Sequence, residues 1–304
     1  MVRRSASAKA YMARYEFETL QVTSPTPHVL LVELNRPEIY NALNQELGRE
    51  LGECFKRIHD DRHCRAVVVA GAGKHFSAGL DYQDLIKLVE KVSKPVNEPV
   101  DSSESLLQGN DIGRKAKFLN GMITYFQESF NSIETCAKPV IAAVYGNCIG
   151  AAFSLLGACD VRYASKDTLF QMKEVDIGMT PDMGSLQRVP KTVGNASLFK
   201  EMIFSAKKFS SVEAEKMGLI SNVFADAETT KSAALELAQV ISTKSPIAVQ
   251  GTKVCYRYSR DHTVYDGLRF MANWNMTMYQ SEDLIKGVTA TATKNRTPSD
   301  YQDL

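Results

Sequence analysis

The sequence predicts an α/β fold, and three observations carry this prediction. Short apolar runs typical of buried strands alternate along the chain with longer stretches of helical periodicity. Two of the apolar runs, 66–70 and 139–145, each lead into a turn rich in glycine, alanine or serine. With 304 residues, 44% of them hydrophobic and 23% charged, the chain can bury a sizeable core.

The first half of the chain is expected to hold three strands and two helices. Residues 29–34, 66–70 and 139–145 are strand-like, whereas 41–58 and 121–135 have apolar side chains at helical spacing. Between them, the polar stretch 86–120 is expected to be a surface excursion beside the first turn. The second helix carries an apolar stripe that we assign to the core: Met122, Ile123, Phe126, Phe130 and Ile133.

The second half alternates short strands with helices and ends in a helical region. Strands are expected at 160–164 and 168–172. From Thr289 onward the polar composition predicts a frayed tail. The helices are expected at 183–193, 195–204, 210–217, 227–243 and 246–278.

The two small-residue turns are the strongest functional signal in the chain. They are Gly73–Asp81 (GKHFSAGLD) and Gly146–Ala152 (GNCIGAA). Small residues after a buried strand let backbone N–H groups approach a ligand that larger side chains would block. Two such turns can direct two donors to one oxygen, as an oxyanion hole requires. The second turn runs into a helix-like stretch, 149–158, whose dipole would strengthen its donors.

Together with Cys159–Ala164, these turns resemble the crotonase (enoyl-CoA hydratase/isomerase) superfamily from about residue 15 to 283. Within it, five stretches are similar to the Δ3,5-Δ2,4-dienoyl-CoA isomerases. These stretches are 170–178, 184–190, 244–250, 258–262 and 274–278.

The resemblance implies a crotonase fold, which is a spiral of repeated ββα units followed by a helical C-terminal trimerisation region. We divide the chain accordingly into a basic tail (1–15), a spiral core (16–225) and a C-terminal helical region (226–304). The implied assembly is a homo-oligomer, a trimer or a hexamer built as a dimer of trimers. The implied activity is the shift of a 3,5-dienoyl-CoA to a 2,4-dienoyl-CoA in β-oxidation.

The resemblance also implies that the two turns bind the thioester carbonyl of an acyl-CoA substrate. The oxyanion-hole donors would be the backbone N–H groups of Leu80 and Ala151. The family usually has three glycines at 150–152, but Ala151 still supplies an N–H. Losing one preorganised donor typically costs about 10²–10³ in rate. The substrate-binding residues would be Ser77, Ala78, Gly79, Leu80, Asp81 and Ala151.

The acid and base groups implied by the resemblance are Glu174 and Asp182. A 1,5 proton shift needs one group to remove a proton at C2 and a second to supply one at C6. Carboxylates in an apolar acyl pocket have raised pKa values, so one can act as a base while the other acts as an acid. Without that context, the two residues would be solvated loop acids. Asp176 is expected to be structural, and His75 of the first turn is not expected to be a base.

Ser154 is the departure from the family pattern, because the position is acidic in the dienoyl-CoA isomerases and in the hydratases. Hydratases use two carboxylates to position water, so Ser154 argues against hydration. Loss of a like charge should lower the pKa of Glu174. Two alternatives follow: a Δ3-Δ2-enoyl-CoA isomerase, which could work with one carboxylate, and a catalytically silent acyl-CoA-binding or scaffold protein. Retention of both Glu174 and Asp182 favours an enzyme.

Composition narrows the remaining possibilities. A net charge of +1 argues against a nucleic-acid partner, and no apolar run approaches the roughly 20 residues that span a bilayer. The six cysteines show no metal or disulfide spacing and are expected to be buried thiols. We expect no metal and no cofactor, since CoA belongs to the substrate. The basic tail resembles a mitochondrial transit peptide, with a peroxisomal location as the alternative.

Overall fold

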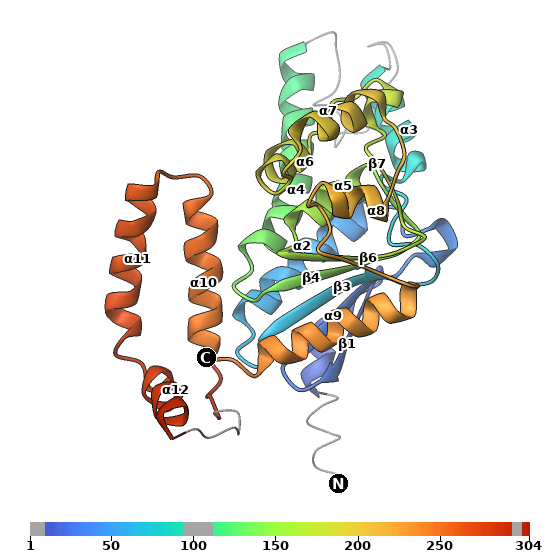
Figure 1. The fold of residues 1–304 in the computed structure, drawn as a ribbon. Helices are drawn as coiled ribbons and strands as arrows, with labels where there is room; N and C mark the ends of the chain where they lie inside the picture. Colours follow the sequence, from blue (N-terminus) through green and yellow to red (C-terminus); the bar gives the residue numbers. More distant parts are fainter. Residues whose placement is uncertain (1–9, 94–111, 294–299) are drawn as a thin grey trace.

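The computed structural model describes residues 10–93, 112–293 and 300–304. It confirms the α/β prediction: a central sheet carries helices on both faces, and three further helices stand to one side (Figure 1). Most of the N-terminal tail lies outside the described residues. The strands are β1 (Leu20–Thr26), β2 (Val29–Leu34), β3 (Ala66–Gly71), β4 (Val140–Val144), β5 (Asn147–Ile149), β6 (Val161–Ser165), β7 (Leu169–Gln171), β8 (Phe209–Ser210) and β9 (Asn222–Phe224).

The helices surround the strands and continue beyond them. The longer ones are α2 (Gln45–Asp60), α3 (Tyr82–Ser93), α4 (Ile112–Thr135), α5 (Ala151–Ala158), α7 (Ala196–Ser205), α9 (Ala227–Ser242), α10 (Pro246–Ser259), α11 (Val264–Met278) and α12 (Glu282–Ala292). The shorter ones are η1 (Ala13–Tyr15), η2 (Pro37–Ile39), η4 (Glu174–Ile177), α6 (Ser185–Arg188), η5 (Val189–Lys191) and α8 (Ser211–Lys216). No helix in the described ranges is long and apolar enough to cross a membrane.

The large sheet has the order β1-β2-β3-β4-β6-β9 and separates two apolar cores. Every pair in it is parallel except β1 with β2. Successive residues of a strand face opposite sides, so Val67 and Val69 enter the core that contains α2. Val68 faces the other way and packs in the core with Ala234 and Ala238 of α9. Both faces are covered, which explains why these strands read as continuous apolar runs.

A second, smaller sheet has the order β5-β7-β8, and its strand β5 follows β4 along the chain. The turn after β4 therefore makes a short strand, β5, before helix α5 begins at Ala151. The helix expected at 149–158 starts two residues later than predicted, because Asn147, Cys148 and Ile149 pair in parallel with β7.

Asn41 accounts for the late start of the first predicted helix. It adopts a left-handed conformation with φ of 54° instead of opening the helix at residue 41. Its side-chain amide donates to the carbonyl groups of Ala72 (2.9 Å) and His75 (2.8 Å). Helix α2 begins at Gln45, and the side chain of Asn44 caps it by accepting from the N–H of Leu47. Asn41 thus supports the first small-residue turn.

The middle and the end of the chain are more helical than expected. The ends of the predicted surface excursion are helices with half-buried or exposed side chains, since α3 covers 86–93 and α4 begins at Ile112; residues 94–111 lie outside the described ranges. The tail is not frayed from Thr289, because α12 continues to Ala292. The stretch 246–278 is two helices, and Thr263 caps the second.

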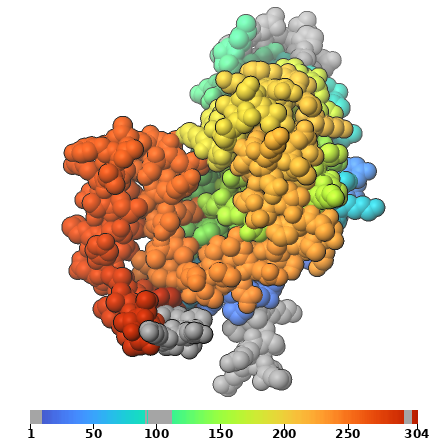
Figure 2. Space-filling model, in the orientation of Figure 1, coloured from blue at the N-terminus to red at the C-terminus, as the bar shows by residue number. Residues whose placement is uncertain are grey.

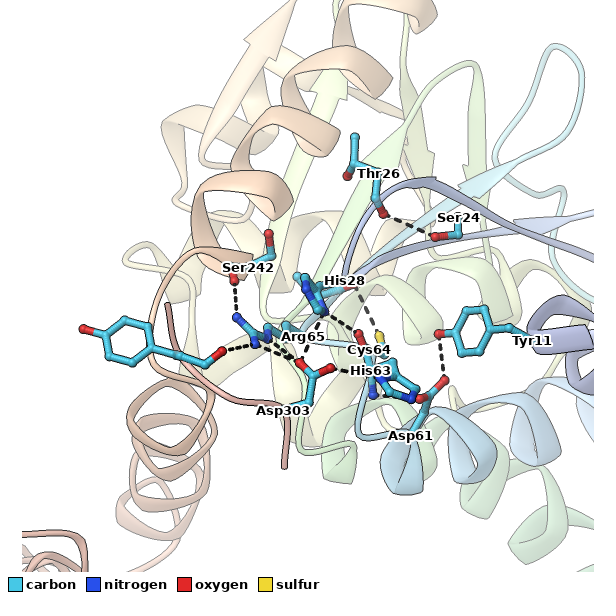
Figure 3. Close-up of polar contacts among 12 residues, drawn as sticks. Tyr11, Ser24, Thr26, His28, Asp61, His63, Cys64, Arg65, Ser242 and Asp303 are labelled. Carbon is cyan, nitrogen blue, oxygen red and sulfur yellow. Dashed lines mark hydrogen bonds and ion pairs between the residues drawn. The ribbon is translucent and has the colours of Figure 1, made fainter. Parts of the chain in front are cut away.

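Residues 300–304 are docked to the body of the protein rather than free (Figure 3). The carboxylate of Asp303 accepts from the Arg65 guanidinium at 2.8 and 3.1 Å and lies 2.9 Å from Nδ1 of His63. The same guanidinium donates to the carbonyl groups of Ser242 and Tyr301. Arg65 directly precedes β3, so this cluster ties the end of the chain to the central sheet.

We expect Asp303→Asn to destabilise the protein at neutral pH. Burial opposes ionisation of Asp303, but the hydrogen bonds from His63 and Arg65 outweigh it and hold its pKa below the usual value. A lowered pKa stabilises the fold above the pKa of the unfolded chain, and the stabilisation is lost as the pH falls through the folded-state pKa. The variant should lose about 1.5–3 kcal/mol at pH 7 because the buried Arg65 loses a charged partner.

Thermal unfolding of both proteins across pH checks this expectation. The difference in melting temperature should shrink at acidic pH. A difference that stays constant from neutral to strongly acidic pH would contradict the assigned role of the Asp303 charge.

Candidate active site

The two small-residue turns pair with each other through their backbones. The N–H of Ser77 donates to the carbonyl of Asn147 (3.0 Å), and the N–H of Ile149 donates to the carbonyl of Ser77 (3.2 Å). His75 adds a third link, because its Nδ1 accepts from the N–H of Asn147 at 3.1 Å. This contact gives His75 a structural task, in line with its exclusion as a base.

Gly79 sets how closely the turns approach. Its φ is 89°, and a Cβ atom there would lie 2.4 Å from the carbonyl oxygen of Ile149 and 3.5 Å from the backbone nitrogen of Ala151. Any side chain would therefore force the turns apart. The next residue, Leu80, has a backbone N–H without a partner among the described residues. The groups beside it are occupied: the carbonyl of Gly79 accepts from the N–H of Leu43, and the N–H of Asp81 donates to the carbonyl of Leu43.

The N-terminus of α5 supplies the second free donor. Gly150 precedes the helix with φ of 55° and offers no side-chain cap, so the N–H of Ala151 has no partner in the described part of the chain. All eight residues of α5 are buried, which keeps water away from its positive end. Leu80 and Ala151 thus present two unused N–H groups from adjacent turns, the type of donor that an oxyanion hole requires.

Glu174 lies against the start of α5. It opens η4, is only 8% exposed, and its Oε1 is 3.5 Å from the place a Cβ on Gly150 would occupy. Its Oε2 is buried without a hydrogen-bond partner among the described residues. Burial raises the pKa of Glu174, the nearby charge of Asp182 adds to this effect, and a backbone hydrogen bond only partly opposes it.

Asp182 is half-buried on the loop that follows η4. Burial raises its pKa above the usual value, and its backbone carbonyl is held by the side-chain amide of Gln127 at 2.6 Å. The structure therefore brings together the two acids that sequence analysis selected, close enough for the charge of Asp182 to act on Glu174. Asp176, between them, is exposed and is approached by the Gln171 amide at 3.4 Å.

A cavity of about 380 Å³ begins at Leu80 and Asp182 and extends between α3 and α4. Its wall is largely apolar, which suits a hydrocarbon chain better than a polar ligand. The apolar lining consists of Leu43, Leu80, Leu85, Leu88, Phe118, Met122, Ile123, Phe126, Met179 and Met183.

The cavity corrects the assignment of the α4 stripe to the core. Phe130 and Ile133 are buried as expected, but Met122, Ile123 and Phe126 are half-buried and line the cavity. Sequence analysis missed them because an apolar stripe at helical spacing has the same pattern whether it faces a core or a binding cavity. The polar stretch 86–120, directly before the stripe, was the available signal that this end of α4 is not enclosed by the core.

Only some of the residues singled out by sequence analysis line this cavity. Leu80 and Asp81 line the cavity, whereas Ser77, Ala78, Gly79, Ala151, Glu174 and Ser154 are not part of its lining. The hydroxyl of Ser77 is fully buried and donates to the carbonyl of Asn41 at 2.7 Å. The Asp81 carboxylate contacts Nη1 of Arg36 (3.1 Å) and accepts from the N–H of Gln83. The polar groups of these two side chains therefore hold the turn in place.

Ser154 is buried on α5, one turn beyond Ala151. Its Oγ has no hydrogen-bond partner among the described residues, as is also true of Oε2 of Glu174. All six cysteines are buried and free, as expected. Within the described residues, no group of His, Cys, Asp and Glu could hold a metal ion.

The fold is shared with solved crotonase-fold structures. A putative enoyl-CoA hydratase from Streptomyces coelicolor A3(2) superposes with a TM-score of 0.80 at 25% identity, covering 94% of this chain and 95% of that one. This confirms the predicted crotonase fold. The sequence matches the enoyl-CoA hydratase/isomerase family over residues 26–112 and 104–301, and the chain belongs to this family.

Two relatives narrow the comparison within the family. The human protein named Delta(3,5)-Delta(2,4)-dienoyl-CoA isomerase, mitochondrial, is 49% identical over 282 residues, which are 93% of this chain and 81% of the relative. The Arabidopsis thaliana protein named Delta(3,5)-Delta(2,4)-dienoyl-CoA isomerase, peroxisomal, is 35% identical over 94% of this chain and 98% of its own length.

We expect Glu174→Gln to stabilise the fold at neutral and alkaline pH. A carboxyl group whose pKa is raised by burial binds its proton more tightly in the folded state, so its ionisation costs stability as the pH rises through the folded-state pKa. Below the pKa of the unfolded chain both states are protonated and this cost vanishes.

The melting temperature of Glu174→Gln should therefore exceed that of the wild type at pH 8, and the two should converge near pH 4. Glu46→Gln is a suitable control, because the exposed Glu46 pairs with Arg49, which lowers its pKa. A loss of stability at pH 8 in Glu174→Gln would show that ionisation of Glu174 does not destabilise the fold.

Proposed function

We propose that this protein is a Δ3,5-Δ2,4-dienoyl-CoA isomerase of unsaturated fatty acid oxidation. The observation that carries the proposal is the pair of acids with raised pKa values, Glu174 and Asp182, beside two free backbone N–H groups and an apolar cavity. The names of the human and Arabidopsis relatives support the same reaction.

The proposed reaction moves one proton out of the substrate and another into it. One of the two carboxyl groups starts ionised and removes a proton from C2, which places negative charge on the thioester oxygen. The N–H groups of Leu80 and Ala151 stabilise that charge as the dienolate forms. The other carboxyl group starts protonated and delivers its proton to C6, leaving double bonds at C2 and C4.

The raised pKa values suit this exchange of roles. A carboxylate with an ordinary pKa would be a weak base and could not hold a proton for delivery near neutral pH. Burial of Glu174 and Asp182 favours the protonated form of each, and the charge of Asp182 disfavours ionisation of Glu174 further. Raised pKa values thus favour an arrangement in which one acid gives up a proton while the other takes one. The reaction requires no cofactor, because CoA is part of the substrate.

Ser154 supports two further candidates. A Δ3-Δ2-enoyl-CoA isomerase could use Glu174 alone for a 1,3 shift, and an acyl-CoA-binding protein would need neither acid. The binding protein is less well supported, because binding alone gains nothing from two carboxyl groups whose ionisation burial opposes.

We further propose a homo-oligomer, a trimer or a hexamer, formed through the C-terminal helical region. Helices α10, α11 and α12 stand beside the body of the protein (Figures 1 and 2). They expose large apolar side chains, which in a water-soluble protein mark a contact surface. These side chains include Val264 (81% exposed), Tyr265, Leu268, Met276, Tyr279 and Ile285. The location that the human relative's name supports is the mitochondrion, with the peroxisome as the alternative.

Absorbance of the 2,4-dienoyl thioester, in which the diene is conjugated with the carbonyl group, tests the proposed activity directly. Purified protein should convert 3,5-dienoyl-CoA to this product, and Glu174→Gln and Asp182→Asn should each lower turnover by at least about 10²-fold. Binding of acyl-CoA should change little, because both substitutions preserve size and remove only proton transfer.

Two control substrates separate this activity from its alternatives. Crotonyl-CoA should not be hydrated appreciably, since Ser154 supplies no second water-positioning carboxylate. Turnover of 3-enoyl-CoA without conversion of 3,5-dienoyl-CoA would favour the Δ3-Δ2 isomerase. Acyl-CoA binding without turnover of either substrate would favour the binding protein.

Ser154→Asp tests how residue 154 acts on Glu174. A carboxylate at this buried position would place like charge near Glu174 and raise its pKa further. The limb of the pH–rate profile that reports the ionised base should then move to higher pH. Ser154→Asn is the matched control, since it adds similar bulk without charge and should leave that limb in place. An active Ser154→Asp enzyme with an unchanged profile would disprove communication between the two positions.

A further inference from the structure

Phe126 separates the cavity from a glycine on the neighbouring helix. It belongs to α4 and lines the cavity, yet its ring also packs on Gly48 of α2. A Cβ atom on Gly48 would lie 2.7 Å from Cε1 and 3.0 Å from Cδ1 of this ring. The ring of Tyr125 meets it edge-on, with 5.9 Å between ring centroids.

Because residue 48 has no side chain, the ring of Phe126 can pack directly on α2. Glycine inside a helix costs roughly 0.5–1 kcal/mol relative to alanine, so local propensity does not favour it at this position. On the packed face of α2 it leaves space that the ring of Phe126 fills. Without that space, the ring would have to move away from α2.

The direction of such a movement follows from the surroundings. Leu47 and Leu51, on either side of Gly48 in the sequence of α2, are completely buried, so the helix is fixed in the core. The ring of Phe126 also lines the cavity, so it borders empty space. Because packed interiors resist displacement, we expect a ring displaced from Gly48 to move into the cavity rather than into α2.

We propose that Gly48 and Phe126 together determine which acyl chain lengths the cavity accepts. Gly48 acts as a positioning residue: because it has no side chain, the Phe126 ring can pack against α2, and the cavity stays open for a long hydrocarbon chain. The proposal rests on the proposed function, since it takes the cavity as the acyl site. Each methylene group that fits there adds about fourfold to binding, so lost space penalises long chains selectively.

Gly48→Ala tests the proposal through the ratio of kcat/KM for a long-chain to a short-chain 3,5-dienoyl-CoA. We expect the ratio to fall at least about tenfold, the effect of excluding two methylene groups. Adding Phe126→Leu to this variant should restore the ratio, because the smaller side chain vacates the cavity. Phe126→Leu alone should raise it above the wild-type value, which keeps a test available if Gly48→Ala does not fold.

Gly52→Ala is the matched control, one turn further along α2. A Cβ atom there would lie 3.4 Å from Oγ of Ser129, which is not part of the cavity lining. The same substitution on the same helix should therefore leave the ratio unchanged. An unchanged ratio in folded Gly48→Ala, or an equal change in Gly52→Ala, would overturn the proposal.

Calorimetric binding of saturated long-chain and short-chain acyl-CoA separates this inference from the proposed function. If the wild type binds both ligands but does not isomerise dienes, the proposed function fails, and the ratio of Kd values in Gly48→Ala still decides the role of Gly48. If Gly48→Ala keeps the wild-type ratio of Kd values, the role of Gly48 fails whatever the activity.

Discussion

The pairing of two turns by their backbones is the constraint on which the site depends. Ser77 exchanges two backbone hydrogen bonds with the segment 147–149, and these hold the turns that carry Leu80 and Ala151 beside each other. Backbone donors held in this way need no reorganisation when charge develops on a ligand oxygen. The arrangement demands glycine at residue 79, because the carbonyl of Ile149 occupies the space of a Cβ atom.

The close packing around the start of α5 also explains why the pKa of Glu174 is raised. Helix α5 is buried along its whole length, so the segment that packs against its N-terminus is shielded from water as well. Glu174 lies there with one carboxylate oxygen unpaired, and burial raises its pKa. A fold selected for stability alone would pair or expose such a group. Its persistence is consistent with a functional cost of the kind that active sites retain at the expense of stability.

Sequence analysis predicted the fold class and the two turns, because alternating apolar and helical stretches and clusters of small residues are local signatures. The roles of Glu174 and Asp182 come from the family resemblance and stay a prediction. Sequence analysis misplaced features that depend on the partner of a residue. Asn41 was placed in a helix, whereas its amide holds the first turn, and Phe126 was placed in the core, whereas its ring packs against the core and also lines a cavity. The docking of Asp303 on Arg65 joins positions 238 residues apart, which no local pattern indicates.

Helix α4 shows how packing and specificity arise from one surface. Its buried end, with Phe130 and Ile133, joins the core, while its other end forms a cavity wall with Phe126 at the boundary. The glycines of α2 decide where that boundary lies, because they set how far the rings and hydroxyls of α4 can approach. A change in the core at residue 48 would therefore reach the ligand, although Gly48 is not part of the cavity lining. The cavity is in this sense an extension of the hydrophobic core that the protein leaves unfilled.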